Sequence, residues 1–231
     1  MAEGRSRRKR GSLSPEEIVA AALALLDREG EDALTYAHLG EELKASPTAV
    51  YRHFASRADL VRAMADHLDG LSLAGYEPTD RWRDDLIELA WRAWRIAIGH
   101  PAAAAIAMNV MTNGVHELHA VDAVLRAIHR AGLEGRQAVV YYQVYANLVL
   151  GAAQAQAARL ASSERGSAGG EWIQVYTPAD PDQYPYAESV KADLRLVDYE
   201  EVFAKQLEMY LDALELVVTQ RTTEAGGVTA S

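Results

Sequence analysis

Apolar residues recur every three or four positions along most of the chain, and this spacing predicts helices rather than strands. Residues 14–30 show it most clearly, because a Ser-Pro start precedes the apolar stripe and Gly30 follows it. Similar stripes extend from Pro47 to near Phe54, from Ser56 through Leu68, and over residues 35–43, 80–99, 102–113, 116–131, 134–160 and 198–220. The sequence therefore predicts an all-α protein.

Capping residues mark where the first four helices begin. Ser14 and Glu17 have the spacing of a capping box, in which each side chain binds the backbone of the other. Thr35, Ser46 and Ser56 stand directly before the next three apolar stripes, where a hydroxyl can accept a free backbone N–H. These starts make the N-terminal helices the best-defined part of the prediction.

The helices divide into two units. Four short helices joined by tight turns form the first, over residues 14–74, and longer helices form the second, over residues 79–221. The segment "GYEPTD" between them contains glycine and proline, which interrupt helices. Residues 162–186, rich in Ser, Gly and Pro, are predicted to form a loop, and residues 222–231 a disordered tail.

Composition narrows the class of protein. The chain has no cysteine, which excludes disulfides and thiolate metal sites. It also has no apolar run near the ~20 residues of a membrane helix, so we expect a cytoplasmic protein with no membrane partner. The net charge is −10, yet residues 1–13 hold five basic residues against one acid. This basic arm either binds an anionic partner or serves as a solubilising tail.

The third predicted helix, "SPTAVYRHF", has an unusual surface. At about 100° per residue, Pro47, Val50 and Phe54 share one face, which is expected to point toward the first two helices. The other side contains no acid and carries Thr48, Ala49, Tyr51, Arg52 and His53. A face rich in hydrogen-bond donors suits the base edges and phosphates of DNA, and a helix-turn-helix presents such a face to the major groove.

Arg57 gives a separate indication of an anionic partner. It lies in the first turn of the fourth helix, where a cation opposes the helix dipole. A phosphate bound there would pair with Arg57 and accept free backbone N–H groups. The alternative is that Arg57 simply points into solvent.

Residues 14–64 resemble the DNA-binding domain of TetR-family transcriptional regulators. The resemblance rests on "LTYAHLGEEL", "SPTAVYRHF" and "SRADL". The most specific part is the spacing of Tyr51, His53, Phe54, Arg57 and Leu60. It implies a homodimeric regulator, usually a repressor, that binds an inverted-repeat operator in double-stranded DNA. It also implies a larger C-terminal domain that dimerises and binds a small-molecule effector.

The predicted DNA contacts follow from this comparison and from the exposed face. They are Thr35, Tyr36, Ser46, Thr48, Ala49, Tyr51, Arg52, His53 and Arg57. Two residues depart from the family pattern. Lys44 stands in the turn that commonly carries glycine, where a positive φ would cost roughly 1–2 kcal/mol, and Ala37 cannot hydrogen-bond a base edge.

The second unit contains candidates for a ligand pocket among its aromatic and polar residues. They are Trp91, Trp94, Met108, Met111, His116, Tyr141, Tyr145 and Asn147. Apolar walls with a few polar groups are typical of a pocket but equally of a helical core. For dimerisation, residues 134–160 end in small side chains, and residues 198–220 have an apolar arc wide enough to face both core and partner.

Catalysis finds little support in the sequence. No nucleophile elbow, phosphate loop or metal-hydrolase motif occurs, so we predict no enzyme, no cofactor and no catalytic residue. His116 and His119 in "HELH" lack a third ligand nearby, and no metal site is predicted. The alternatives left open are an activator or ligand-independent regulator of the same fold and, more remotely, a helical ligand carrier or enzyme.

Overall fold

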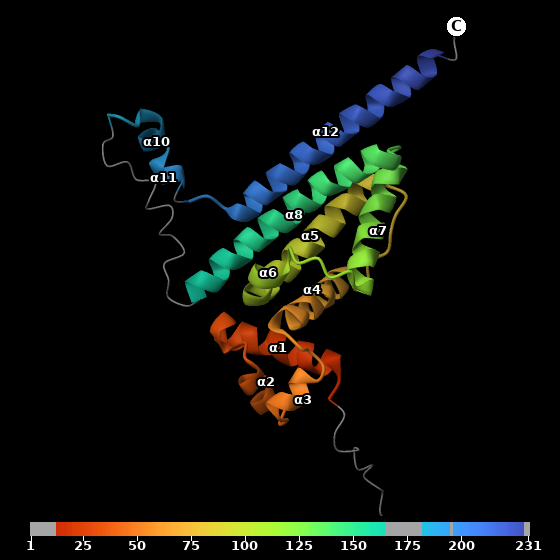
Figure 1. Ribbon diagram of the computed structural model, residues 1–231. Coiled ribbons are helices and arrows are strands. Elements are labelled where there is room, and N and C mark those ends of the chain that lie inside the picture. The colour runs from red at the N-terminus through yellow and green to blue at the C-terminus, as the bar shows by residue number, and fades with distance from the viewer. Residues whose placement is uncertain (1–12, 165–181, 195, 229–231) are drawn as a thin grey trace, which may run out of the picture.

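The computed structural model describes residues 13–164, 182–194 and 196–228, and every regular element in these ranges is a helix (Figure 1). The elements are α1 (Pro15–Glu29), the 3-10 helix η1 (Glu31–Ala33), α2 (Tyr36–Glu42), α3 (Pro47–Tyr51), α4 (Arg57–Leu73), α5 (Trp82–Gly99), α6 (Pro101–Ala107), α7 (Val115–Arg130), α8 (Gly135–Glu164), α10 (Pro185–Ser189), α11 (Lys191–Leu194) and α12 (Tyr199–Val228). The expected all-α fold is confirmed.

The predicted caps form in the N-terminal unit. Ser14 Oγ accepts the N–H of Glu17 at 3.1 Å, and the Glu17 carboxylate accepts the N–H of Ser14 at 3.0 Å. The hydroxyls of Thr35, Ser46 and Ser56 accept the N–H three residues ahead at the starts of α2, α3 and α4. These local bonds fix the helix starts because they satisfy N–H groups that have no partner within the helix.

Helix α4 connects the two units. Leu60 and Met64 are buried with α1 and α2, and the same core extends to Ala103 and Ala107 of α6. Beyond these contacts α4 packs against α5 and α7, whereas α8 and α12 lie side by side on the far side of the second unit (Figure 1). The two units therefore share a packed core across α4 rather than meeting through the "GYEPTD" segment alone.

Several helix boundaries differ from the prediction. The third helix ends at Tyr51 rather than near Phe54, although the N–H of Phe54 still binds the carbonyl of Val50 at 3.0 Å. The helix expected over residues 102–113 ends at Ala107, because residues 108–114 form a loop in which Asn113 has a positive φ of 54°. Side chains that bind nearby backbone groups compete with the helical pattern in such a loop.

The C-terminal segments are more helical than expected. In the predicted loop 162–186, α8 continues through Glu164 and α10 begins at Pro185; residues 165–181 lie outside the described ones. The tail predicted to be disordered from residue 222 is helical in α12 through Val228. Residues 222–225 contain neither glycine nor proline, so the helix has no local stop before Gly226. The basic arm also lies outside the described residues, apart from Leu13, which packs on the core.

Lys44 adopts a positive φ, the conformation that is costly for a residue other than glycine. Its φ is 51°, in the left-handed region, and it follows Leu43, the C-cap of α2. Gly40 makes the turn possible, since a Cβ on it would lie 2.9 Å from the carbonyl oxygen of Ala45 and 3.2 Å from the nitrogen of Pro47. The turn therefore requires the absence of a side chain at residue 40 and tolerates some strain at Lys44.

None of the helices in the described ranges is both long and apolar enough to cross a membrane.

Candidate DNA-binding surface and ligand cavity

The α3 surface carries the side chains that the helical wheel places outside. Val50 and Phe54 are buried against α1 and α2, while Thr48, Arg52 and His53 are exposed. Tyr51 has 53% of its surface exposed despite its size. Ala49 is half-buried, which leaves it little surface for a partner.

Pro47 does not belong to the buried face where the sequence places it. It is exposed because it occupies the first position of α3, where the chain has only just left the turn. Its ring still covers Gly40, with Cδ 3.4 Å from where a Cβ would stand. Pro47 therefore holds the turn between α2 and α3 rather than the core.

Tyr36 supports the α3 surface from α2. Its ring lies 4.1 Å from that of Tyr51, centroid to centroid, and its hydroxyl donates to the carbonyl oxygen of Phe54 at 3.0 Å. That hydroxyl is therefore already bonded within the N-terminal unit. Tyr36 positions the ring of Tyr51 and has no free hydroxyl proton to donate to DNA. Thr35 and Ser46 likewise use their oxygens as caps, accepting N–H groups at 3.2 Å in both cases.

Arg57 has a partner that the sequence does not predict. Its guanidinium binds the carboxylate of Glu31 in η1 at 2.8 Å, so it neither stands free in solvent nor waits unpaired for a phosphate. Both side chains are about half exposed, at 51% and 41%. Exposed ion pairs of this kind contribute ~0–1 kcal/mol, so Arg57 can exchange Glu31 for another anion.

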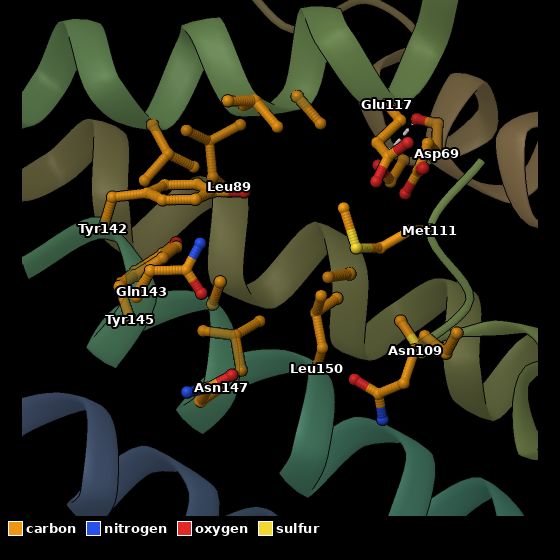
Figure 2. Close-up of a pocket in the computed structure, with 18 of the residues that line it drawn as sticks. Asp69, Leu89, Asn109, Met111, Glu117, Tyr142, Gln143, Tyr145, Asn147 and Leu150 are labelled. Atoms are coloured by element: carbon orange, nitrogen blue, oxygen red, sulfur yellow. Dashed lines mark hydrogen bonds between the residues drawn. The ribbon is translucent and has the colours of Figure 1, made fainter. Parts of the chain in front are cut away.

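A cavity of about 300 Å³ lies in the second unit, between α4, α5, α7, α8 and the 108–114 loop (Figure 2). Its lining is mainly apolar with a few polar groups, and it consists of Asp69, Ser72, Leu73, Leu89, Ala93, Met108, Asn109, Val110, Met111, Glu117, Ala120, Val121, Val124, Tyr142, Gln143, Tyr145, Ala146, Asn147, Val149 and Leu150. This size and mixture are typical of small-molecule sites.

Half of the predicted pocket residues line this cavity. Met108, Met111, Tyr145 and Asn147 do so, but the hydroxyl of Tyr145 points away and donates to the carbonyl of Leu86 at 2.6 Å. The Tyr145 ring therefore contributes an apolar wall. Figure 2 shows Met111 at the side of the cavity opposite Tyr142.

The two predicted tryptophans lie elsewhere. Trp94 stacks on Phe203 of α12 with ring centroids 4.5 Å apart, and Trp91 meets the same ring edge-on at 5.1 Å. Both therefore belong to the interface between α5 and α12. Aromatic residues at helical spacing fit a core as well as a pocket, so the sequence cannot separate the two positions.

His116 and Tyr141 also lie outside the cavity lining. His116 turns toward α4, where its Nδ1 lies 2.9 Å from Oδ2 of Asp66. Tyr141 faces α12, and its carbonyl accepts the hydroxyl of Tyr210 at 2.9 Å. Among the described residues, no group of three or more His, Asp and Glu side chains is placed to hold a metal ion.

Six polar residues of the cavity are missing from the sequence prediction: Asp69, Ser72, Asn109, Glu117, Tyr142 and Gln143. Burial raises the pKa of Asp69 to about 7, with further contributions from the negative charges of Glu117 and Asp66. Asp69 lies within the apolar stripe of α4, and the sequence alone shows this. Acidic side chains rarely face a protein core, so its position in the stripe indicates a functional site.

The outer side of α8 and α12 exposes large apolar side chains. Val139, Val140 and Val144 of α8 are 48–51% exposed, and Met209 and Leu216 of α12 are 65% and 64% exposed. These two helices lie next to each other (Figure 1). Apolar surface of this extent is typical of a protein–protein interface.

Comparisons with known proteins agree on the family. A family model described as "Tetracyclin repressor-like, C-terminal domain" matches residues 74–218, and one described as "Bacterial regulatory proteins, tetR family" matches residues 18–64. HTH-type transcriptional repressor DrrR1 of Streptomyces coeruleorubidus is 25% identical over 230 residues, which cover 95% of this chain and 84% of that protein. An HTH-type transcriptional regulator of Saccharopolyspora erythraea is 29% identical over 155 residues, 67% of this chain and 66% of that protein.

Solved structures show the same fold. ActR of Streptomyces coelicolor in complex with actinorhodin has a TM-score of 0.74 at 23% identity, covering 90% of this chain and 99% of that one. BioQ with its natural double-stranded DNA operator has a TM-score of 0.62 at 22% identity, covering 88% and 99%. The similar proteins are named transcriptional regulators, not enzymes. The chain belongs to the TetR family of transcriptional regulators.

Proposed function

We propose that this protein is a homodimeric repressor that binds an inverted-repeat operator through α3 of each subunit and leaves it when a small molecule occupies the cavity. One observation carries the proposal. Helix α4 has Arg57 in its first turn, beside the α3 surface, and Asp69 near its other end, in the cavity wall. A ligand that moves one end of this helix therefore acts on the other.

The α3 surface supports the DNA contacts. Thr48, Tyr51, Arg52 and His53 present hydroxyl, ring and cationic groups without an acid among them. Arg52 can fork onto guanine or a phosphate, and Tyr51 can bind a phosphate or pack on a sugar. Arg57 joins them by exchanging Glu31 for a phosphate at the start of α4. The basic arm, residues 1–13, adds further phosphate or minor-groove contacts.

Dimerisation is supported by the outer side of α8 and α12. A single short helix on an acidic chain offers few contacts to DNA, and a two-fold dimer doubles them. The exposed Val140, Val144 and Met209 supply the apolar centre that such an interface needs. In this arrangement the two α3 helices face half-sites whose spacing they must match.

Release by a ligand follows from the contacts of α4. This helix packs on α1 at the DNA-binding end and on α5 and α7 around the cavity. A ligand that binds better to one position of α4 shifts the population toward that position. The two α3 helices then move out of register with the half-sites. The structures of ActR in complex with actinorhodin and of BioQ with its operator support both partners by analogy.

The test is a binding titration of the full-length protein on duplexes that it selects from a random DNA pool. Arg52→Ala and Tyr51→Ala should each weaken binding by about tenfold or more. Arg126→Ala is the matched control, because Arg126 is an exposed α7 arginine paired with Asp122, remote from α3. Affinity unchanged in the Arg52 and Tyr51 variants would overturn the assignment of the surface.

The same selected DNA separates the remaining alternatives. An inverted repeat among the selected sequences and a dimer by sedimentation are the expected results. A reporter gene behind this DNA should be switched off by the protein. Higher expression instead would make the protein an activator, and repression that no ligand relieves would make it a ligand-independent regulator.

A further inference from the structure

The charged groups of the cavity are all acids. Asp69 and Glu117 belong to its lining, and none of the lining residues is Lys, Arg or His. The remaining wall is mostly aliphatic and aromatic, with amides at Asn109, Gln143 and Asn147. An anionic ligand would lose its hydration and meet two carboxylates without any compensating cation, so this lining excludes anions.

Asp69 is poised to receive a cation. Among the described residues, its carboxyl group has no hydrogen-bond or ion-pair partner, although it is half-buried. The neighbouring negative charges are Glu117 and Asp66, while His116 faces Asp66 at 2.9 Å instead. A buried carboxyl group that repels its neighbours gains most from a positive charge placed beside it.

Glu117 is held at the same end of the cavity. Its Oε2 accepts the backbone N–H and the hydroxyl of Thr112, at 2.9 and 2.8 Å, and the N–H of Asn113 at 2.6 Å. These bonds all reach one oxygen and fix the direction of the carboxylate. Figure 2 shows Asp69 and Glu117 together at one end, with Tyr142 across the cavity from them. The cavity therefore has an acidic end and an apolar body.

We infer that the ligand of this cavity is a small organic cation, a protonated amine on a largely apolar body, whose ammonium group binds between Asp69 and Glu117. The inference rests on the proposed function, because it takes the cavity to be the effector site. The apolar body lies along Leu89, Val124 and the ring of Tyr145. Charge-assisted hydrogen bonds to the two carboxylates give the cation its advantage over a neutral ligand of the same shape.

Three probes with the same phenyl-plus-four-carbon skeleton test this chemistry: 4-phenylbutylamine, 4-phenylbutanol and 4-phenylbutyrate, each titrated calorimetrically into the full-length protein. The amine should bind on the order of tenfold tighter than the alcohol, and the carboxylate should bind least. Asp69→Asn should remove most of the amine's advantage and leave the alcohol within about threefold. Asp122→Asn is the control, because Asp122 is an exposed acid of α7 outside the cavity.

The outcomes separate this inference from the proposed function. Equal affinity for amine and alcohol, tighter binding of the carboxylate, or no binding of any probe would overturn the inference. Amine affinity unchanged in Asp69→Asn would also overturn it. DNA release is measured apart from ligand binding. If the amine binds through Asp69 and the operator stays bound, the inferred ligand class is correct and the proposed release by ligand is wrong. If the carboxylate releases the operator, release by ligand is correct and the inferred ligand class is wrong.

Discussion

Asp66 of α4 binds His116 at the start of α7 through both the ring and the backbone. Its Oδ2 lies 2.9 Å from Nδ1 of His116, and its Oδ1 accepts the N–H groups of His116 and Glu117, both at 3.0 Å. The residue that precedes α7, Gly114, supplies no side-chain cap, and a Cβ there would overlap the Asp66 carboxylate. The cap of α7 therefore comes from another helix, and it fixes α4 to α7 beside the cavity.

Removing this cap should destabilise the fold. Asp66→Ala leaves two N–H groups of α7 without their acceptor and is expected to lower the free energy of unfolding by about 1–3 kcal/mol. Urea denaturation followed by circular dichroism measures the loss. Asp122→Ala, which removes an exposed acid from α7 itself, should change stability by less than about 1 kcal/mol. A loss no larger than this control would mean that the two N–H groups find other partners.

Asp69 should make stability depend on pH in a direction unusual for a carboxyl group. Its pKa is raised to about 7 by burial and by the charges of Glu117 and Asp66, with His116 acting in the opposite sense and Tyr142 facing it from α8. The folded state then binds more protons than the unfolded state between about pH 4 and pH 7, so this group's contribution to stability decreases as pH rises through that window.

Asp69→Asn isolates this contribution, because asparagine has the same shape and no charge. The variant should come close to the wild type near pH 4 and exceed it at pH 8 by roughly 4 kcal/mol, since one pKa unit corresponds to about 1.4 kcal/mol. Urea titrations at several pH values measure the difference. A difference that stays constant from pH 4 to pH 8 would show that Asp69 titrates normally. Asp122→Asn should show no such trend, because Asp122 is exposed.

The ion pair between the buried Asp85 of α5 and the partly exposed Arg130 of α7 gives a third prediction. Asp85 is only 2% exposed; it accepts the N–H and hydroxyl of Thr79, both at 2.9 Å, and pairs with Arg130 at 3.2 Å. Asp85→Ala leaves Arg130 and Thr79 without their common acceptor and should cost about 1–3 kcal/mol in free energy of unfolding. The double variant with Arg130→Ala should cost less than the sum of the two single changes, since the groups act together. Additive losses would argue against that coupling.

The features that the sequence predicts are those fixed by local chemistry. Ser14, Ser46 and Ser56 cap their helices because a hydroxyl and a free N–H three residues apart meet whatever the rest of the fold does. The outward face of α3 follows from helical geometry in the same way, and Val50 and Phe54 are buried as the wheel predicts.

The cavity depends on contacts between segments far apart in the chain. Asp69 and Glu117 meet only because α4 and α7 pack together. Glu117 binds Thr112 and Asn113 and so holds the 108–114 loop, where the sequence pattern predicts more helix. Trp94 has the same periodic position as a pocket residue, yet α12 covers it with Phe203. Periodicity shows that a side chain faces inward, but not whether another helix or an empty space lies opposite.

The ion pair between Arg57 and Glu31 leads to a prediction about DNA affinity, which rests on the proposed function. If a phosphate replaces Glu31 when the operator binds, the carboxylate competes with DNA for the same guanidinium. Glu31→Gln removes the competitor and should tighten operator binding by roughly threefold to tenfold at low salt. Fluorescence anisotropy on the selected duplex measures the change.

A second pair of variants shows whether Arg57 is the cause. In an Arg57→Ala background, Glu31→Gln should give a much smaller gain, because the guanidinium that both anions share is gone. Glu134→Gln controls for the general loss of a negative charge, since Glu134 is an exposed acid that follows α7, remote from α3. If Glu31→Gln tightens binding no more than Glu134→Gln does, Arg57 makes no phosphate contact and its role is to hold η1 to α4.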